Sequence, residues 1–205
     1  MGKSVFLTNG AEWQRQRRII DPAFQSGGVK KSFPAMWVAG EQAIARLHPR
    51  VAQTTAVEIE AEISHAVADV IFRTLFSLPV TDQIAAQVFE QFKTYQRSQP
   101  LLNAATFLKL PRWLPGFFRR DTRRSVRSIR RLITQLTAHR MGQVKRGTAP
   151  DDLATKIMTQ ADPETHVRFS IDEMVDQMAI FFLAGHETSA SALAWALYLL
   201  ATHPA

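Results

Sequence analysis

The sequence of 205 residues contains no cysteine. This absence excludes disulfide bonds, cysteine-ligated zinc sites, iron–sulfur clusters and thiol nucleophiles within the chain. It also removes the usual indication of redox compartment, because paired cysteines mark oxidising environments. Hydrophobic residues make up 46% of the chain, which is ample for a buried core.

The sequence also lacks a long hydrophobic run. Its longest uncharged apolar stretches, residues 177–186 and 188–202, are shorter than the ~20 residues that a bilayer span needs. No secretory signal follows Met1, and Phe6 stands where a myristoylation site needs serine or threonine. We therefore expect a soluble, cytoplasmic chain without a transmembrane segment.

Alternating runs of the kind that form strands are missing, so we expect a mainly α fold. Capping-box patterns, with glutamate three residues after a polar residue, begin at Asn9, Thr55 and Ser170. Residues 100–118, with prolines and aromatics, predict a long irregular connection. The last helix is apolar on nearly every side, which predicts burial within a larger protein. Helical periodicity predicts helices over residues 9–21, 34–47, 55–78, 82–97, 119–146, 152–160 and 171–202.

The net charge of +7 is concentrated in one segment. Residues 119–146 contain ten lysines and arginines and one acid, Asp121, so the rest of the chain is slightly acidic. The basic face of this helix is either simply solvated or binds an anionic partner. Nucleic acid is not expected, because the chain has no zinc-finger ligand set and the basic helix has no interleaved aromatic residues. The residues that recur on this face are Arg120, Arg124, Arg127 and Arg131.

A polar group interrupts the apolar helix predicted over residues 171–202. Residues 184–188, Ala-Gly-His-Glu-Thr, place a glycine, a carboxylate and a hydroxyl on a hydrophobic surface. Gly185 allows the helix to widen or a ligand to approach, and Glu187 with Thr188 could pass protons to a bound group. The alternative is a polar pair that stabilises a helix kink by local hydrogen bonds. A zinc-protease motif is excluded because Ala190 stands where the second histidine is needed, so His186 is expected to be a packed or a surface residue rather than a metal ligand.

A second polar group lies near the start of the chain. Trp13 and Arg17 are four residues apart and therefore share one helix face. An indole N–H and a guanidinium together form a donor pair suited to carboxylates or phosphates. The alternative is a cation–π pair on a surface helix.

Together the two groups resemble motifs of the cytochrome P450 family, the haem-thiolate monooxygenases. The family's helix C carries tryptophan-x-x-x-arginine. A glycine precedes this motif, and a second arginine and then Pro-Ala-Phe follow it. Its helix I carries alanine/glycine-glycine-x-acid-threonine. Their order and separation of about 170 residues also suit the family. The matching residues are Gly10, Trp13, Arg17, Arg18, Pro22, Ala23 and Phe24 for helix C, and Ala184, Gly185, Glu187 and Thr188 for helix I.

The resemblance implies an incomplete cytochrome P450 fold, running from helix C to helix I in one partial domain over residues 1–205. Residues 100–118 would then be the F–G cover of the substrate channel, and the basic segment would be helix G. The intact relative would use haem, O2 and electrons from a ferredoxin or flavoprotein reductase to hydroxylate a hydrophobic small molecule. A terpenoid or fatty-acyl substrate is the expected class.

The resemblance also implies roles for individual residues. Trp13 and Arg17 would bind the haem propionates. Ala184 and Gly185 would face the haem and oxygen, with Phe181 and Leu183 as neighbours of substrate. The catalytic pair would be Glu187 and Thr188, which would deliver protons for oxygen activation.

The sequence departs from the family in three respects. The thiolate ligand of the haem iron is missing, because the chain has no cysteine and hence no metal-ligating residue of the family's type. The glutamate-x-x-arginine of helix K is also missing, and so are the N-terminal sheet and helices A and B. We therefore expect the chain alone to be inactive. Three hypotheses are consistent with these departures. The chain is part of a longer enzyme, it is the remnant of a disrupted gene, or it is a non-enzymatic helical binding module with a basic face.

Overall fold

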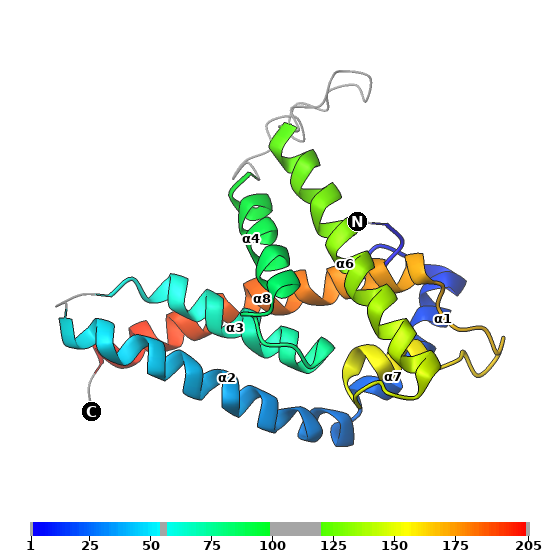
Figure 1. Ribbon diagram of the computed structural model, residues 1–205, viewed down its shortest axis with the longest axis horizontal. Coiled ribbons are helices and arrows are strands. Elements are labelled where there is room, and N and C mark those ends of the chain that lie inside the picture. Colours follow the sequence, from blue (N-terminus) through cyan, green and yellow to red (C-terminus); the bar gives the residue numbers. More distant parts are fainter. Residues whose placement is uncertain (1, 54–56, 99–119, 204–205) are drawn as a thin grey trace.

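One long helix, α8 (Ile171–Thr202), runs through the molecule, and α3 (Ile59–Phe76) and α6 (Arg120–Arg146) pack directly on it (Figure 1). The computed structural model describes residues 2–53, 57–98 and 120–203. Within these residues there is no strand, and the only β-type pairing is an isolated bridge between Ala161 and Arg168. The remaining elements are α1 (Gly10–Ile20), the 3₁₀ helix η1 (Asp21–Phe24), α2 (Ser26–Gln53), α4 (Gln83–Ser98) and α7 (Leu153–Thr159).

The helices form two groups along α8. Helices α2 and α3 pack on each other, and α3 packs on α8. Helices α4 and α6 form a second pair that projects away from α8, while α1 and α7 lie near the start of α8 (Figure 1). No helix in the described part of the chain has the length and hydropathy to cross a membrane.

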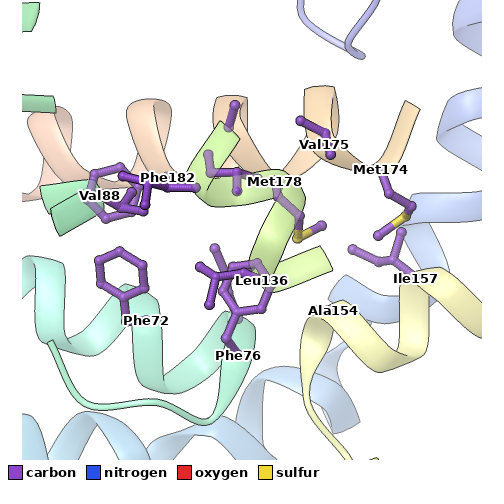
Figure 2. Packing of buried hydrophobic residues seen from close by; sticks show 14 of the residues in the cluster. Phe72, Phe76, Val88, Leu136, Ala154, Ile157, Met174, Val175, Met178 and Phe182 are labelled. Atoms are coloured by element: carbon purple, nitrogen blue, oxygen red, sulfur yellow. The ribbon is translucent and has the colours of Figure 1, made fainter. Parts of the chain in front are cut away.

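The core lies where α3, α4, α6 and α7 meet the first half of α8. The ring of Phe182 lies 5.0 Å from that of Phe72 and 4.5 Å from that of Phe92, measured between centroids. Figure 2 shows Phe182 near Phe72 and Val88, and Met174 facing Ile157 of α7. Because burying one such side chain contributes about 1.5–3 kcal/mol, this cluster supplies the main force that holds the helices on α8.

The prediction for α8 is confirmed at both of its ends. Ser170 accepts a hydrogen bond from the Glu173 N–H, and the Glu173 carboxylate accepts one from the Ser170 N–H, which completes the capping box. Burial is confirmed only for the first half of the helix. Beyond His186 the apolar side chains are exposed, with Trp195 at 63% and Leu200 at 70%.

The prediction for α2 was wrong at both ends. A helix over residues 34–47 was expected to stop at proline, but the helix begins at Ser26 and continues through Pro34 and Pro49 to Gln53. A proline removes one intrahelical hydrogen bond and bends the helix. The helix can nevertheless continue past the proline when the turns on either side pack against other parts of the protein. Here the second half of α2 is attached to α3 through Glu62, which pairs with arginines of α2, Arg46 at 3.7 Å and Arg50.

The expected capping boxes of the first and third helices have different outcomes. Asn9 precedes α1 as expected, but its side chain makes no capping hydrogen bond. The carboxylate of Glu12 lies 4.0 Å from the Lys3 ammonium instead of returning to the backbone of Asn9. Thr55 lies outside the described residues, and α3 begins at Ile59. Residues 100–118 also lie outside them, so the F–G cover stays a prediction.

The other helices agree with the sequence. Helices α4, α6 and α7 match the predictions for residues 82–97, 119–146 and 152–160 within one or two residues at each end. Asp152 caps α7 by accepting a hydrogen bond from the Thr155 N–H at 3.0 Å. Ser77 ends α3 in a left-handed conformation with φ of 53°, shortly before Pro79.

Candidate functional site

The Trp13–Arg17 pair lies on a partly exposed face of α1. The guanidinium carbon of Arg17 lies 5.7 Å from the centre of the Trp13 ring, so the expected pairing on one face is present. The Arg17 Nε lies 2.9 Å from a carboxylate oxygen of Asp21, one helical turn later. Trp13 is 40% exposed, and its indole N–H has no hydrogen-bond acceptor within the described residues. The pair is therefore accessible to a ligand.

The neighbouring arginines of α1 serve a different purpose. Arg15 pairs with Glu173 at the start of α8 and lies over the ring of Phe169. Arg18 donates two hydrogen bonds, of 2.6 and 3.0 Å, to the buried carboxylate of Asp162. These hydrogen bonds hold the pKa of Asp162 well below its usual range. Arg15 and Arg18 thus attach α1 to the rest of the molecule, and Arg17 is turned outward.

Residues 184–188 lie in the middle of α8. The Thr188 hydroxyl donates a hydrogen bond of 2.6 Å to the carbonyl oxygen of Ala184 one turn earlier. This is the local bond that the kink interpretation expected, and it leaves the hydroxyl oxygen free to accept another. Gly185 is turned toward α3, because a Cβ there would lie 3.4 Å from the Ile71 Cδ1. Gly185 therefore has a packing role between two helices.

His186, expected to be a packed or a surface histidine, is buried. It is 3% exposed, lies parallel to the Phe182 ring at 5.5 Å, and meets the Phe89 ring edge-on. Its Nε2 lies 3.1 Å from both the hydroxyl and the carbonyl oxygen of Ser64. Burial lowers the pKa of His186 below its ordinary value of 6.5, so the imidazole is neutral near pH 7. No group of three or more metal-ligating side chains occurs in the part of the chain that the structure describes.

Glu187 and Thr188 are both exposed but face different surroundings. Glu187 lines an open groove of about 950 Å³ between the start of α3, the end of α4 and the second half of α8. Thr188 does not line this groove. The carboxylate and the hydroxyl therefore lie on adjacent sides of α8. The groove was not foreseen from the sequence, because its cations, Lys93 and Arg97, come from a helix far from Glu187 in the chain.

An aromatic contact joins the two motifs. The rings of Phe24, just after α1, and Phe181 of α8 lie 5.5 Å apart in an edge-to-face arrangement. Phe181, Ala184 and Thr188 follow one another at helical spacing and thus share one side of α8. Ala184 lies 11 residues beyond Glu173, which contacts α1, or about 16 Å along the helix axis. The end of the first motif therefore lies beside Phe181, on the side of α8 that carries Ala184 and Thr188.

The residues present fit part of a haem site. A guanidinium and an indole N–H that are both turned outward match two carboxylate groups such as haem propionates. Asp21 is the partner that sequence reasoning missed, although its spacing of four residues from Arg17 indicates such a pair. None of the 205 residues can serve as the thiolate ligand of the iron.

The helical fold and the order of these two motifs are similar to those of haem-thiolate proteins. The model of the family described as Cytochrome P450 matches residues 1–205, and the chain belongs to the cytochrome P450 family. The chain is 32% identical to the cytochrome P450 monooxygenase FUM15 of Gibberella moniliformis, over 99% of this chain and 37% of that protein. It is 28% identical to the 11-oxo-beta-amyrin 30-oxidase of Glycyrrhiza uralensis, over 95% of this chain and 39% of that protein.

A comparison of structures agrees. The crystal structure of the cytochrome P450DA heme domain matches with a TM-score of 0.71 and 23% sequence identity, over 99% of this chain and 43% of that one. The predicted fold class, a mainly α and incomplete cytochrome P450 fold, is confirmed. The chain spans about two fifths of the length of the proteins that it matches.

Proposed function

We propose that residues 1–205 form part of a single cytochrome P450 domain and supply two of its functions, binding of haem propionates and delivery of protons. The intact enzyme would insert one oxygen atom from O2 into a hydrophobic small molecule. The observation that carries the proposal is the outward donor pair on α1. Arg17 and Trp13 are turned outward, whereas Arg15 and Arg18 pair with internal carboxylates.

The donor pair would bind two carboxylates. The Trp13 N–H would donate a hydrogen bond, and the free amino groups of Arg17 would pair with a propionate while Asp21 holds the Nε side. Bound haem supplies the redox-active iron on which O2 is activated. Hydrogen bonds to charged groups contribute about 1.5–3 kcal/mol each when partly shielded from water. Two such bonds are enough to orient the group against α1.

The second function belongs to the middle of α8. The Thr188 hydroxyl donates its proton to the carbonyl of Ala184, so its oxygen would accept a hydrogen bond from a water and hold that water in position to deliver protons to a bound ligand. Glu187 faces the open groove and would exchange protons with its water. Because the two side chains lie on adjacent sides of α8, one ordered water between them would complete the route.

The proposal includes the substrate, the partners and the compartment. A terpenoid or fatty-acyl substrate is supported by a relative named for oxidation of 11-oxo-beta-amyrin. The electron donor would be a ferredoxin or a flavoprotein reductase, and the location would be cytoplasmic. Since this chain has no cysteine, we propose that it is inactive by itself and that the thiolate comes from sequence outside it. A remnant of a disrupted gene is the alternative.

The decisive experiment begins with the DNA on both sides of the coding sequence. An in-frame glutamate-x-x-arginine and a cysteine loop support a working enzyme, whereas stop codons support the remnant. The longer product, reduced and exposed to carbon monoxide, is expected to absorb at about 450 nm, and residues 1–205 with haemin are not. Such a band from residues 1–205 alone would contradict the proposed inactivity.

A second experiment tests the donor pair without activity. Haemin titrated into residues 1–205 is expected to quench tryptophan fluorescence, and R17Q is expected to weaken binding about tenfold through the loss of one charged hydrogen bond. R168Q, at an exposed arginine outside α1 and α6, is the matched control. Haemin dimethyl ester, which has no carboxylates, is expected to bind the original chain and R17Q equally. Equal affinity of haemin for both chains would refute the role of Arg17.

A further inference from the structure

The arginines of α6 divide into two sets. Arg130 pairs with Asp176 and lies 3.6 Å from Asp172, both on α8. Arg140 is buried and binds Asp152 and the carbonyl oxygen of Phe76. These two arginines hold α6 in place, and internal carboxylates balance their charges.

The second set has no such partners. Arg123, Arg124, Arg127 and Arg131 are exposed, and within the described residues none has a carboxylate oxygen within 4.0 Å. The only side-chain hydrogen bond recorded for them joins the Arg127 Nε to the carbonyl oxygen of Arg123. We call these four residues the arginine row.

The arginine row points directly away from the core. At 100° per residue its four members fall within one quarter to one third of the helix circumference. The residues buried on the other side of α6 are Ser125, Ile129, Leu132, Ile133 and Leu136. The row therefore covers about 12 Å of a straight ridge, from residue 123 to residue 131, on the projecting α4–α6 pair (Figure 1).

The chemistry of this surface selects the partner. No large hydrophobic side chain of α6 is exposed in the described part of the chain, so the ridge lacks the apolar core of a protein interface. It has no aromatic residue on which a nucleobase could stack. A flat anionic surface contacts every arginine of the row at once.

We propose that the arginine row docks the protein on anionic phospholipid bilayers as a peripheral contact, which goes beyond the proposed oxygenase function. Each basic side chain near such a surface strengthens binding severalfold, and the attraction falls off within the Debye length of about 8–10 Å. Binding would therefore depend on lipid charge and on salt, and no segment would have to enter the bilayer.

Vesicle co-sedimentation of residues 1–205 tests the proposal. The chain is expected to bind vesicles that contain phosphatidylserine at low salt, to leave them at about 0.5 M salt, and not to bind phosphatidylcholine alone. R124Q/R127Q/R131Q is expected to bind about a hundredfold more weakly. R124K/R127K/R131K is expected to retain binding, because the charge is kept. Circular dichroism establishes that each variant is folded.

The matched control removes the same net charge from other exposed positions, as K3Q/K30Q/R168Q. It is expected to bind within about threefold of the original chain, because its charges are scattered over the molecule. Equal weakening by both triple variants would overturn the proposal in favour of net charge alone. Binding to phosphatidylcholine that salt does not reduce would overturn it in favour of apolar insertion. Tighter binding to duplex DNA than to vesicles would overturn it in favour of a nucleic-acid partner.

Discussion

The buried pair of Arg140 and Asp152 is the most informative place to test the fold. Arg140 is 4% and Asp152 is 6% exposed. The guanidinium binds the Asp152 carboxylate and the carbonyl oxygen of Phe76, and the carboxylate also accepts from the Ser77 hydroxyl at 2.9 Å. Three elements therefore meet here: α6, the end of α3 and the cap of α7. The pair holds the second half of α6 on the core.

We predict that D152N destabilises the chain by about 3–5 kcal/mol. The asparagine oxygen can still accept the Thr155 N–H and cap α7, but the charge of Arg140 is left buried without a counter-ion. A loss of about 4 kcal/mol is a large part of the 5–15 kcal/mol that ordinary domains possess. With a urea dependence of about 2 kcal/mol/M, the unfolding midpoint is expected to fall by about 2 M.

The assay is urea unfolding followed by circular dichroism, with a double-mutant cycle. R140M/D152N is expected to be more stable than D152N alone, because replacing both charges removes the uncompensated one. E90Q breaks the exposed Lys93–Glu90 pair and is expected to cost no more than about 1 kcal/mol. If D152N costs no more than E90Q, or if the double variant shows only additive losses, the reasoning is refuted.

Two further predictions concern the middle of α8. G185A is expected to keep or raise the melting temperature, since its Cβ would lie 3.4 Å from the Ile71 Cδ1 and alanine favours helix. G185V is expected to lower the free energy of unfolding by about 1–3 kcal/mol, because valine would push Ile71 aside. The control is G40V, where the added side chain meets open space and causes little loss through packing. Equal losses in the two variants would contradict this account. His186 has a lowered pKa because it is buried, so the unfolded chain takes up a proton below about pH 6.5 that the folded chain resists, and stability falls as pH falls. Urea unfolding at pH 8 and at pH 5 measures this loss, which is expected to be smaller in H186F than in the original chain. The loss that remains in H186F is assigned to His65, whose pKa is also lowered. The same pH dependence in both chains would contradict the prediction.

Local signals predicted the helices well where they acted alone. The bounds of α8 follow from a capping box and from an apolar pattern that resumes after residues 184–188. The bounds of α2 do not follow from sequence, because Pro34 and Pro49 are local stop signals that packing overrides. Whether a helix continues past proline depends on contacts from elsewhere, here those of Glu62 on α3. A single sequence does not display such contacts.

The candidate site was predictable as a set of residues but not as an arrangement. The spacing of Trp13 and Arg17 placed them on one face, and the structure agrees. The spacing of Glu187 and Thr188 gave no sign that the carboxylate faces a groove while the hydroxyl does not. That difference arises because α3 and α4 border only one side of α8. The sequence likewise predicted that Gly185 lets the helix widen or a ligand approach, and it gave no sign of the neighbouring Ile71, which a Cβ at Gly185 would contact at 3.4 Å.

The relation between the two motifs is fixed within this chain. The Lys3 N–H donates to Asp176 and the Val5 N–H donates to Gln177, so the segment before α1 is bound to the first turns of α8. The Gln16 amide donates to the Lys3 carbonyl and ties α1 to that same segment. The level of α1 along α8 is thus set by contacts that do not involve an iron ligand. It follows that propionate binding and proton delivery can be preorganised here even though the residues that would bind the iron are not, which is why the haem-binding and carbon monoxide measurements on residues 1–205 should give different answers.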